Sequence, residues 1–288
     1  MTRPLTWRGG ALPAGRPAVM AILNVTPDSF FDGGRHSSVE RAVARAWAVV
    51  DEGADVLDLG GESTRPGAAD IGDDEELRRT IPVIEALVAA DYPLPISLDT
   101  SRARVAAEGL AAGVVIVNDV TGGTREPALL DHVAAHGAAV VLMHMRGTPR
   151  TMQQHTDYAD VVADVLASLR ACCDAATAAG IPASSQAVDP GIGFAKTAAD
   201  SLRLLAHTDA LALGRPILIG ASRKSFLRAF GQEGDDRLFG SLAVAAGTAL
   251  LGADIVRVHD VRATRAVLDV TMGLLEARGG RPLGAPPE

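Results

Sequence analysis

A repeated passage from helix to buried strand limits this chain to a small set of folds. Four times, an amphipathic segment ends in small residues and continues into an apolar run that closes with a polar residue. The four passages are EGADVLDLG, AAGVVIVND, AHGAAVVLM with His144, and LGADIVRVH. In each, the glycine suits the C-cap of a helix, and the β-branched run is typical of a strand buried on both faces. The repeat therefore predicts helix–strand units in series.

Four more apolar runs bring the number of predicted strands to eight: Ala18–Leu23, Leu94–Leu98, Ala187–Val188 and Pro216–Ile219. Helical patterns separate the strands, at about residues 39–52, 73–90, 102–112, 127–135, 158–179, 198–206, 223–230 with 237–251, and 261–275. Eight alternating units in 288 residues predict an α/β protein, a single-domain (β/α)8 TIM barrel with right-handed crossovers. A doubly wound open sheet remains the alternative, because the number of strands does not prove that the sheet closes.

The two ends of the chain are expected to lie outside the barrel proper. Residues 1–17 are rich in Gly and Pro and predict an N-terminal extension, a short ribbon that closes the bottom of the barrel. Residues 18–278 form the predicted barrel, and residues 279–288 a flexible tail. The segment Ser241–Leu251 is apolar almost all round, so it is expected to be covered on two sides, by a second subunit or by neighbouring helices.

Composition excludes several classes of function. The net charge is −8 with no basic block, so nucleic-acid binding has no compositional support. No run of 18 uncharged apolar residues and no apolar signal core occurs, which predicts a soluble protein without a membrane span or targeting segment. Cys172 and Cys173 are adjacent in a helical segment, an arrangement that suits neither a disulfide nor a zinc site. A reducing, cytoplasmic location is therefore expected.

Polar residues gather where the predicted strands end, and in barrels of this kind the carboxyl ends of the strands form the site. Each buried polar group left without a partner costs roughly 1–3 kcal/mol, so a purely structural barrel has little reason to collect them. Asp58 sits deeper in its strand and is open to a structural role, pairing within the barrel. The whole set comprises Asn24, Asp58 with Glu62, Asp99, Asn118, Met143 with His144, Asp189, Lys224, and Arg257 with His259.

The last strand predicts an anion site. Arg257 and His259 are two residues apart, so their side chains point to the same face, and a guanidinium beside an imidazole suits phosphate. Arg65, in the loop GESTRPG, can add another cation. Asn24 lies near Asp28 and offers an amide oxygen, a plausible ligand for a hard cation such as magnesium.

Other strand ends predict a site for a flat heterocycle. Asp99, Asn118 and Asp189 supply acceptors and an amide, which suit a ring with several N–H and amino donors. Lys224 can bind a ring oxygen or nitrogen, or a carboxylate. The sequence has no nucleophile–His–carboxylate arrangement and no Walker or dinucleotide fingerprint. These features favour activation of a bound phosphorylated substrate over covalent catalysis.

Two long, polar, glycine-rich loops follow the first two predicted strands, NVTPDSFFDGGRHSS and GGESTRPGAADIGDDE. Mobile loops over a barrel mouth commonly exclude water from a reactive intermediate. Ordinary surface loops are the alternative. Phe30 and Phe31, in a chain with only 3% aromatic residues, favour the functional interpretation.

Eight segments, in order from about Val19 to Asp260, resemble dihydropteroate synthase. They are MAILNVTPDSFFDGG, LGGESTRPGA, SLDTSRARVA, NDVTGG, VVLMHMRGTPRTMQ, VDPGIGFAK, LIGASRKSFL and DIVRVHDV. The resemblance implies a (β/α)8 barrel, usually a homodimer, in folate biosynthesis. It implies a transferase that joins 6-hydroxymethyl-7,8-dihydropterin diphosphate to p-aminobenzoate, with magnesium, to give 7,8-dihydropteroate and diphosphate.

The same resemblance implies a role for each matching position. The implied catalytic residues are Asp28, Arg65, Asp99, Asp189, Lys224, Arg257 and His259. The implied pterin pocket consists of Asp99, Asn118, Met143, Asp189, Gly220 and Lys224. Asn24, Arg65, Arg257 and His259 would hold the diphosphate, with Asn24 also at the metal. The implied p-aminobenzoate pocket consists of Phe30, Thr64, Pro66, Phe194, Lys224 and Ser225, with Ser225 at the carboxylate.

The mechanism that the resemblance implies is dissociative: diphosphate departs, and the arylamine captures a carbocation at the pterin methylene. The chain departs mildly from the family pattern, in SLDTSRA, where a Tyr-Lys pair often follows Asp-Thr, and in Phe31, where Ser is commoner. Two alternatives share the barrel. A pterin-binding methyltransferase has no need of Arg257, His259 or the SRKSF cluster. A catalytically silent pterin-binding paralogue should have lost a loop or metal residue, whereas Asn24, Asp28, Thr64 and Arg65 are all present.

Overall fold

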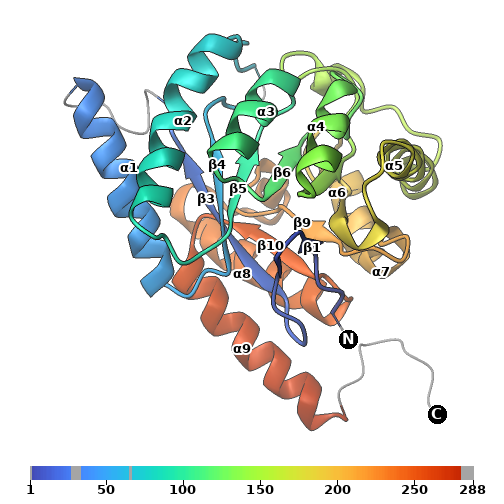
Figure 1. Ribbon diagram of the computed structural model, residues 1–288. Coiled ribbons are helices and arrows are strands. Elements are labelled where there is room, and N and C mark those ends of the chain that lie inside the picture. The colour runs from blue at the N-terminus through green and yellow to red at the C-terminus, as the bar shows by residue number, and fades with distance from the viewer. Residues whose placement is uncertain (1, 27–33, 65–66, 280–288) are drawn as a thin grey trace.

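The computed structural model describes residues 2–26, 34–64 and 67–279, and a sheet of eight parallel strands forms its centre. Figure 1 shows this sheet inside a ring of helices. The strands pair in the order β8-β7-β6-β5-β4-β3-β10-β9, and a parallel bridge between Val188 and Ile217 joins the two outer strands. The backbone N–H of Val188 also donates to the carbonyl of Pro216 at 2.9 Å. The sheet therefore closes into the predicted (β/α)8 barrel, and the doubly wound alternative is excluded. The strands are β3 (Ala18–Asn24), β4 (Val56–Gly60), β5 (Ile96–Asp99), β6 (Ile116–Asp119), β7 (Ala139–Met143), β8 (Gln186–Asp189), β9 (Leu218–Ile219) and β10 (Ile255–Val258).

Helices surround the barrel (Figure 1). Capping residues explain several of their ends: α3 and α4 stop at glycines in the left-handed region, Gly113 and Gly137, and Thr197 with Asp200 forms a capping box on α6. The helices are α1 (Gly34–Asp51), α2 (Asp73–Ala89), α3 (Ala103–Ala112), α4 (Ala128–His136), α5 (Val161–Ala178), α6 (Ala198–Ala206), α7 (Thr208–Leu211), α8 (Arg237–Leu250) and α9 (Val261–Ala277).

The helix predicted over residues 223–230 is wrong in its start and its type. Arg223 has a φ of 56° and Lys224 is extended, so only Ser225–Phe230 turns, as the 3-10 helix η4. Arg223 is held outside the helix because its side chain pairs with Asp260 at 2.7 Å. Three short 3-10 turns, η2 (Met152–Gln154), η3 (Ala183–Ser185) and η5 (Gly234–Asp236), and the single-turn α7 have no counterpart in the sequence prediction.

Successive side chains of each strand point to opposite faces of the sheet, so the core has a part inside the barrel and a part between the strands and the helices. Val19, Ala21 and Leu23 of β3 face the helices, whereas Ala18 and Met20 join the cluster inside the barrel. The hairpin of β1 (Thr6–Trp7) and β2 (Gly10–Ala11) places Leu5 and Leu12 in that inner cluster, as expected for a ribbon that closes the bottom. The interior is thus apolar near the amino ends of the strands, and the polar residues lie toward the other end.

Helix α8 contains most of the apolar segment Ser241–Leu251, and it packs against α9. Neighbouring helices therefore account for part of its apolar surface. Phe239 of α8 nevertheless remains 67% exposed, and Val270 and Leu274 of α9 are exposed to a similar extent.

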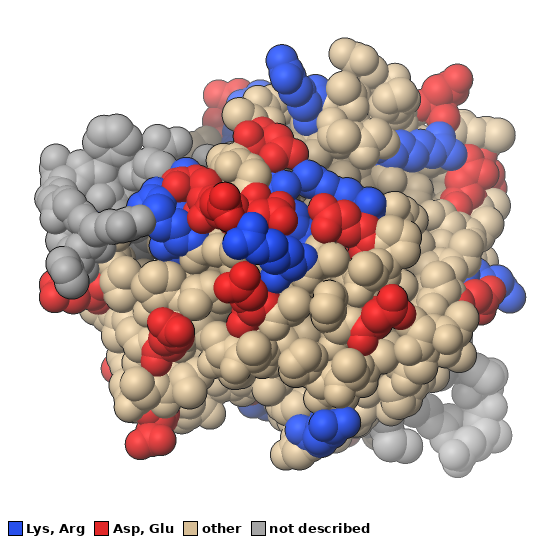
Figure 2. Space-filling view, turned by 45° about the horizontal axis from the view of Figure 1, so that its top comes forward, with Lys and Arg blue, Asp and Glu red and all other residues tan. Residues whose placement is uncertain are grey.

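On the face seen in Figure 2, acidic and basic side chains intermingle, and no large area of a single charge forms. Within the described residues, no helix combines the length and the hydropathy needed to cross a membrane. The division of the chain at residues 17 and 278 stays a prediction, and residues 280–288 lie outside the described part.

Candidate active site

A buried ion-pair network lies inside the barrel mouth, built on the ends of four strands. Arg257 of β10 donates from Nε to Asp58 and from Nη2 to Asp99, both at 2.6 Å. Asp58 also accepts hydrogen bonds from Ser97 Oγ at 2.6 Å and Asn118 Nδ2 at 3.1 Å. Asp58 is fully buried, so the structure confirms that it pairs within the barrel. Its carboxylate orients the guanidinium and the amide that reach the mouth.

In this network, burial and the neighbouring charges shift the pKa values in opposite directions. Burial raises the pKa of Asp99 to about 7, although the neighbouring Arg257 guanidinium acts in the opposite direction. Burial would also lower the pKa of Arg257, but Asp58 and Asp99 together raise it above its ordinary value. Arg257 therefore stays charged, and Asp99 exchanges its proton near neutral pH.

A second group forms where β8 and β9 end. Asp189 is 5% exposed, and its Oδ1 accepts the backbone N–H of Gly191 at 2.7 Å. Gly191 has a φ of 68°, and a Cβ there would lie 2.1 Å from the carbonyl oxygen of His144, so only glycine fits this turn. Burial raises the pKa of Asp189, against the charge of Lys224.

Lys224 joins this group from the loop after β9. Its Nζ donates to the carbonyl of Ile192 at 2.5 Å and lies 4.3 Å from the ring centroid of Phe194. Burial lowers the pKa of Lys224 to about 8, although Asp189 partly offsets this effect. A Cβ on Gly220 would lie 3.7 Å from Asp189 Oδ2 and 3.9 Å from Arg257 Cβ. The bare glycine thus leaves room between the two polar groups of the mouth.

The register of the sheet places Asn24, Gly60, Asp99 and Asn118 on one level around the barrel. Gly60 leaves an open position there: a Cβ on it would lie 3.4 Å from Asn24 Oδ1 and 3.8 Å from Asp99 Oδ2. An amide oxygen beside an open position suits a hard cation that takes its other ligands from water and phosphate. In residues 2–26, 34–64 and 67–279, no cluster of three His, Cys, Asp or Glu side chains forms a metal cage.

The structure brings together most, but not all, of the predicted site residues. Met143 ends β7 in register with Asp189, and Phe194 lies beneath Lys224. Ser225 is exposed at the start of η4, and Ser222 Oγ lies 3.1 Å from His259 Nδ1 at the end of β10. Five predicted residues lie outside the described part of the chain, so their roles stay predictions: Asp28, Phe30, Phe31, Arg65 and Pro66.

Lys196, a buried lysine that no sequence pattern singled out, lies behind this site. Lys196 Nζ lies 3.0 Å from His144 Nδ1 and 2.9 Å from the carbonyl oxygen of Phe194, and both side chains are 4% exposed. Burial, and then the charge of Lys196, lower the pKa of His144 to about 3, and burial lowers that of Lys196 to about 7. Lys196 ends the segment GFAK, but no local sequence pattern indicates that its partner, His144, lies 52 residues earlier in the chain.

His144 is therefore expected to make stability depend on pH. Below about pH 6.5 the unfolded chain binds a proton at His144 that the folded protein does not, so stability falls as the pH is lowered toward about 3. The variant His144→Gln can still accept a hydrogen bond from Lys196 but cannot titrate. Between pH 6.5 and pH 5, its free energy of unfolding should fall by roughly 2 kcal/mol less than that of the wild type. Urea titrations at the two pH values measure this, with the exposed His136→Gln as the control, and equal slopes for all three proteins would contradict the assignment.

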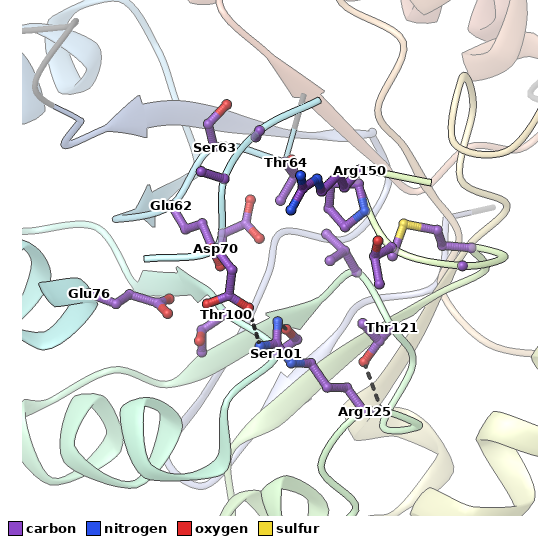
Figure 3. A pocket seen from close by; sticks show the side chains of 18 of the residues that line it. Glu62, Ser63, Thr64, Asp70, Glu76, Thr100, Ser101, Thr121, Arg125 and Arg150 are labelled. Atoms are coloured by element: carbon purple, nitrogen blue, oxygen red, sulfur yellow. Dashed lines mark hydrogen bonds and ion pairs between the residues drawn. The ribbon is translucent and has the colours of Figure 1, made fainter. Parts of the chain in front are cut away.

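A cavity of about 450 Å³ opens beside the mouth, among the loops that follow β4, β5, β6 and β7 (Figure 3). Asp99 lines both the cavity and the ion-pair network, so the two spaces adjoin. The cavity does not reach Asp189 or Lys224. Its lining includes Glu62, Thr64, Asp70, Ser101, Arg125 and Arg150.

Comparisons with known proteins agree with this geometry. Residues 20–259 match the family model described as "Pterin binding enzyme". The chain is 45% identical to a dihydropteroate synthase of Synechocystis over 262 residues, 90% of each protein. Among solved structures, it is similar to the Yersinia pestis dihydropteroate synthase in a sulfonamide complex, with a TM-score of 0.88 and 41% identity over 95% of this chain and 99% of that one. It is also similar to the Xanthomonas albilineans enzyme with 4-aminobenzoic acid, with a TM-score of 0.87 and 46% identity over 95% and 98% of the two chains.

Proposed function

The chain belongs to the dihydropteroate synthase family of pterin-binding enzymes, and we propose that its barrel mouth binds and activates the pterin substrate. The protein is a transferase of folate biosynthesis. It joins 6-hydroxymethyl-7,8-dihydropterin diphosphate to p-aminobenzoate and releases diphosphate. The observation that carries the proposed site is the buried network in which Arg257 contacts Asp58 and Asp99, next to Asp189 and Lys224.

The pterin ring takes the space between Asp99, Asn118 and Asp189. Its amino group and ring N–H groups are donors, and Asp189 is a buried carboxylate with one oxygen engaged by Gly191. Charge-assisted hydrogen bonds to such a carboxylate are about twice as strong as neutral ones. Met143 and Gly220 supply an apolar surface and clearance for the ring, and Lys224 contacts its acceptor side.

The diphosphate lies toward Asn24, Arg257 and His259, with Arg65 added from the loop after β4. Arg257 keeps its positive charge because Asp58 and Asp99 raise its pKa. Magnesium would be held by Asn24 Oδ1 together with the diphosphate oxygens and water, and it would offset the negative charge of the leaving group. Ser222 orients the His259 ring through the 3.1 Å contact at Nδ1.

The p-aminobenzoate lies at the rim, between Phe194, Lys224, Ser225 and Thr64, with Phe30 and Pro66 from the two loops. Phe194 offers a ring for stacking, and Lys224 holds a cation 4.3 Å from that ring. The exposed Ser225 hydroxyl can donate to the carboxylate. Lys224 thus lies between the two substrates.

The reaction proceeds by departure of diphosphate before the new bond forms. The C–O bond at the pterin methylene breaks, its electron pair leaves with the diphosphate, and the positive charge spreads into the ring. Asp189 and Asp99 stabilise that charge, because fixed carboxylates in a buried site act strongly on a cation. The amine nitrogen then donates its lone pair to the methylene carbon, and its N–H bond breaks as the proton passes to water or to the released diphosphate.

The test is an assay of purified protein with pterin diphosphate and magnesium, with and without p-aminobenzoate. Diphosphate release and dihydropteroate formation are followed together, and both should depend on the amine. A sulfonamide should compete with p-aminobenzoate. Tight binding of pterin diphosphate without product would indicate a silent pterin-binding protein, and methyl transfer from a methylated pterin to a cobalamin protein would indicate the methyltransferase.

The protein assembles as a homodimer through the surface of α8 and α9. Phe239, Val270 and Leu274 are each more than 60% exposed, and exposed apolar side chains on adjacent helices are typical of subunit interfaces. The variant Phe239→Glu should therefore shift the molar mass in solution from two chains toward one, as measured by light scattering. The matched control is Val88→Glu, an apolar side chain on α2 that is 46% exposed. A single-chain mass for the wild type would contradict the proposal.

A further inference from the structure

One buried side chain, that of Arg102, forms hydrogen bonds with both ends of the loop between β4 and α2. Arg102, at the start of α3, has a side chain only 4% exposed. Its Nη2 donates to Glu62 at 3.0 Å, where the loop begins, and to Asp70 at 2.8 Å, where the loop ends. Its Nε donates to Glu76 of α2 at 2.7 Å. A single guanidinium therefore joins both ends of this loop to the helix that follows.

Other contacts reinforce this arrangement but depend on the same acidic residues. Glu62 also accepts the backbone N–H of Ile71 at 3.1 Å, so the two ends of the loop contact each other directly. Arg125, after β6, donates to Asp70 at 2.8 Å and to Ser101 at 3.3 Å. Figure 3 shows Asp70, Ser101 and Arg125 close together beside the cavity.

The positive charge of Arg102 and the negative charges of its acidic partners favour the bonded arrangement. Burial raises the pKa of Glu76, while Arg102 lowers it, so the buried carboxylate needs the guanidinium beside it. The hydrogen bond from Arg102 lowers the pKa of Asp70, which keeps that carboxylate ionised. Burial opposes the charge of Arg102, but its bonds to Asp70 and Glu76 raise its pKa above the ordinary value. Burial thus favours the protonated form of Glu76, whereas the bonds from Arg102 favour the ionised forms of Asp70 and Glu76.

We propose that Arg102 is a positioning residue for the second substrate, because it holds both ends of the loop that carries Thr64. This inference rests on the proposed function, in which Thr64 contributes to the p-aminobenzoate pocket. Arg102 itself touches neither substrate: it acts through Glu62 and Asp70, which flank Thr64 along the chain. Releasing either end changes where Thr64 lies relative to Phe194 and Lys224.

The experiment compares two paired sets of variants. Asp70→Asn removes the negative charge that pairs with Arg102 and Arg125 and so weakens the hold on the far end of the loop, at a residue whose side chain is 62% exposed, so folding should be little affected. Arg102→Met removes the guanidinium. Arg102→Lys keeps the positive charge but lacks the planar guanidinium whose separate N–H groups bond to carboxylates at both ends of the loop. The matched controls are Asp74→Asn and Arg104→Met, which form a neighbouring ion pair at 2.7 Å between the same helices but touch no loop residue.

Asp70→Asn and Arg102→Met should raise the KM for p-aminobenzoate and lower kcat/KM by about tenfold to about a hundredfold. Arg102→Lys should recover part of this loss, and the controls should stay within about twofold of the wild type. Binding of free 6-hydroxymethylpterin, measured by calorimetry, should be unchanged in all variants. A purely structural role would lower the unfolding midpoint and leave the KM for p-aminobenzoate unchanged, and that result would overturn the proposal.

Hydrogen exchange separates this inference from the proposed function. Peptides that cover residues 67–72 should exchange faster in Asp70→Asn than in the wild type and in Asp74→Asn, whether or not product forms. Unchanged exchange in that segment overturns the role of Arg102. Absence of dihydropteroate from the wild-type protein, with faster exchange in Asp70→Asn, overturns the proposed function and leaves the anchoring of the loop by Arg102 intact.

Discussion

A protein with Asp189→Asn is expected to fold as the wild type does and to bind pterin diphosphate at least about 100-fold more weakly. Asn is the same size as Asp, and its oxygen can still accept the backbone N–H of Gly191. It has no negative charge, however, and its amide N–H groups face the donor edge of the ring. One charge-assisted bond is lost and one donor is left without an acceptor, and each effect costs about 1–3 kcal/mol.

The fold should survive this change because the ionised carboxylate is itself costly to bury. Burial raises the pKa of Asp189, which means that the site disfavours the charged form. Calorimetry with pterin diphosphate measures the affinity, and thermal unfolding measures the stability. Wild-type affinity in Asp189→Asn would remove Asp189 from the pterin pocket.

The matched control is Asp254→Asn, at the opposite end of the barrel. Asp254 is also buried, and it accepts the backbone N–H groups of Arg3 at 2.6 Å and Ile217 at 2.9 Å. This variant should lose stability and keep its affinity for pterin diphosphate. The two variants therefore separate the role of a carboxylate in binding from its role in folding.

Removal of the Arg257 side chain is expected to impair both folding and binding. Arg257→Met leaves Asp58 and Asp99 buried without their cation, and breaking a buried ion pair in this way costs about 3–5 kcal/mol. Binding of pterin diphosphate should weaken far more than binding of free 6-hydroxymethylpterin, because only the former needs the cation. Calorimetry with the two ligands measures the difference, and equal losses would contradict the anion site.

The stability loss in Arg257→Met should depend on pH in a defined direction. The pKa of Asp99 is already raised from 3.8 to about 7 in the folded protein. Ionised Asp99 therefore lowers the free energy of unfolding as the pH rises from 3.8 to about 7, and it has no such effect below pH 3.8, where the carboxyl is protonated in both states. Without Arg257 the penalty at high pH is larger, and protonation relieves it. The difference in unfolding free energy between wild type and variant should therefore be smaller at pH 5 than at pH 8.

A second substitution separates the two roles of Arg257. Asp58→Asn, added to Arg257→Met, removes one of the two uncompensated charges and still accepts the bond from Ser97. The double variant should regain part of the lost stability and none of the affinity for diphosphate. Recovery of both would mean that Arg257 acts only through the fold.

Much of the fold followed from local sequence, because strand and helix periods are local properties. Apolar runs predicted the strands, four of them after a glycine cap, and the two-residue spacing of Arg257 and His259 predicted that these side chains share one face. The exception is Arg223 with Lys224. Their place in a helical pattern was overridden by the ion pair between Arg223 and Asp260, 37 residues away.

The sequence by itself determined that Asp99, Asn118, Asp189 and Lys224 lie at strand ends, since each follows an apolar run within a few residues. Only the tertiary structure decided what each contacts. Arg257 pairs with Asp58 and Asp99, 199 and 158 residues away, Lys196 with His144, and Arg102 with both ends of one loop. Closure of the barrel through Val188 and Ile217 brings distant strand ends face to face, and no local periodicity encodes which ends will meet. A residue's position along its own strand is a local property, whereas its charge partner depends on how the whole sheet closes.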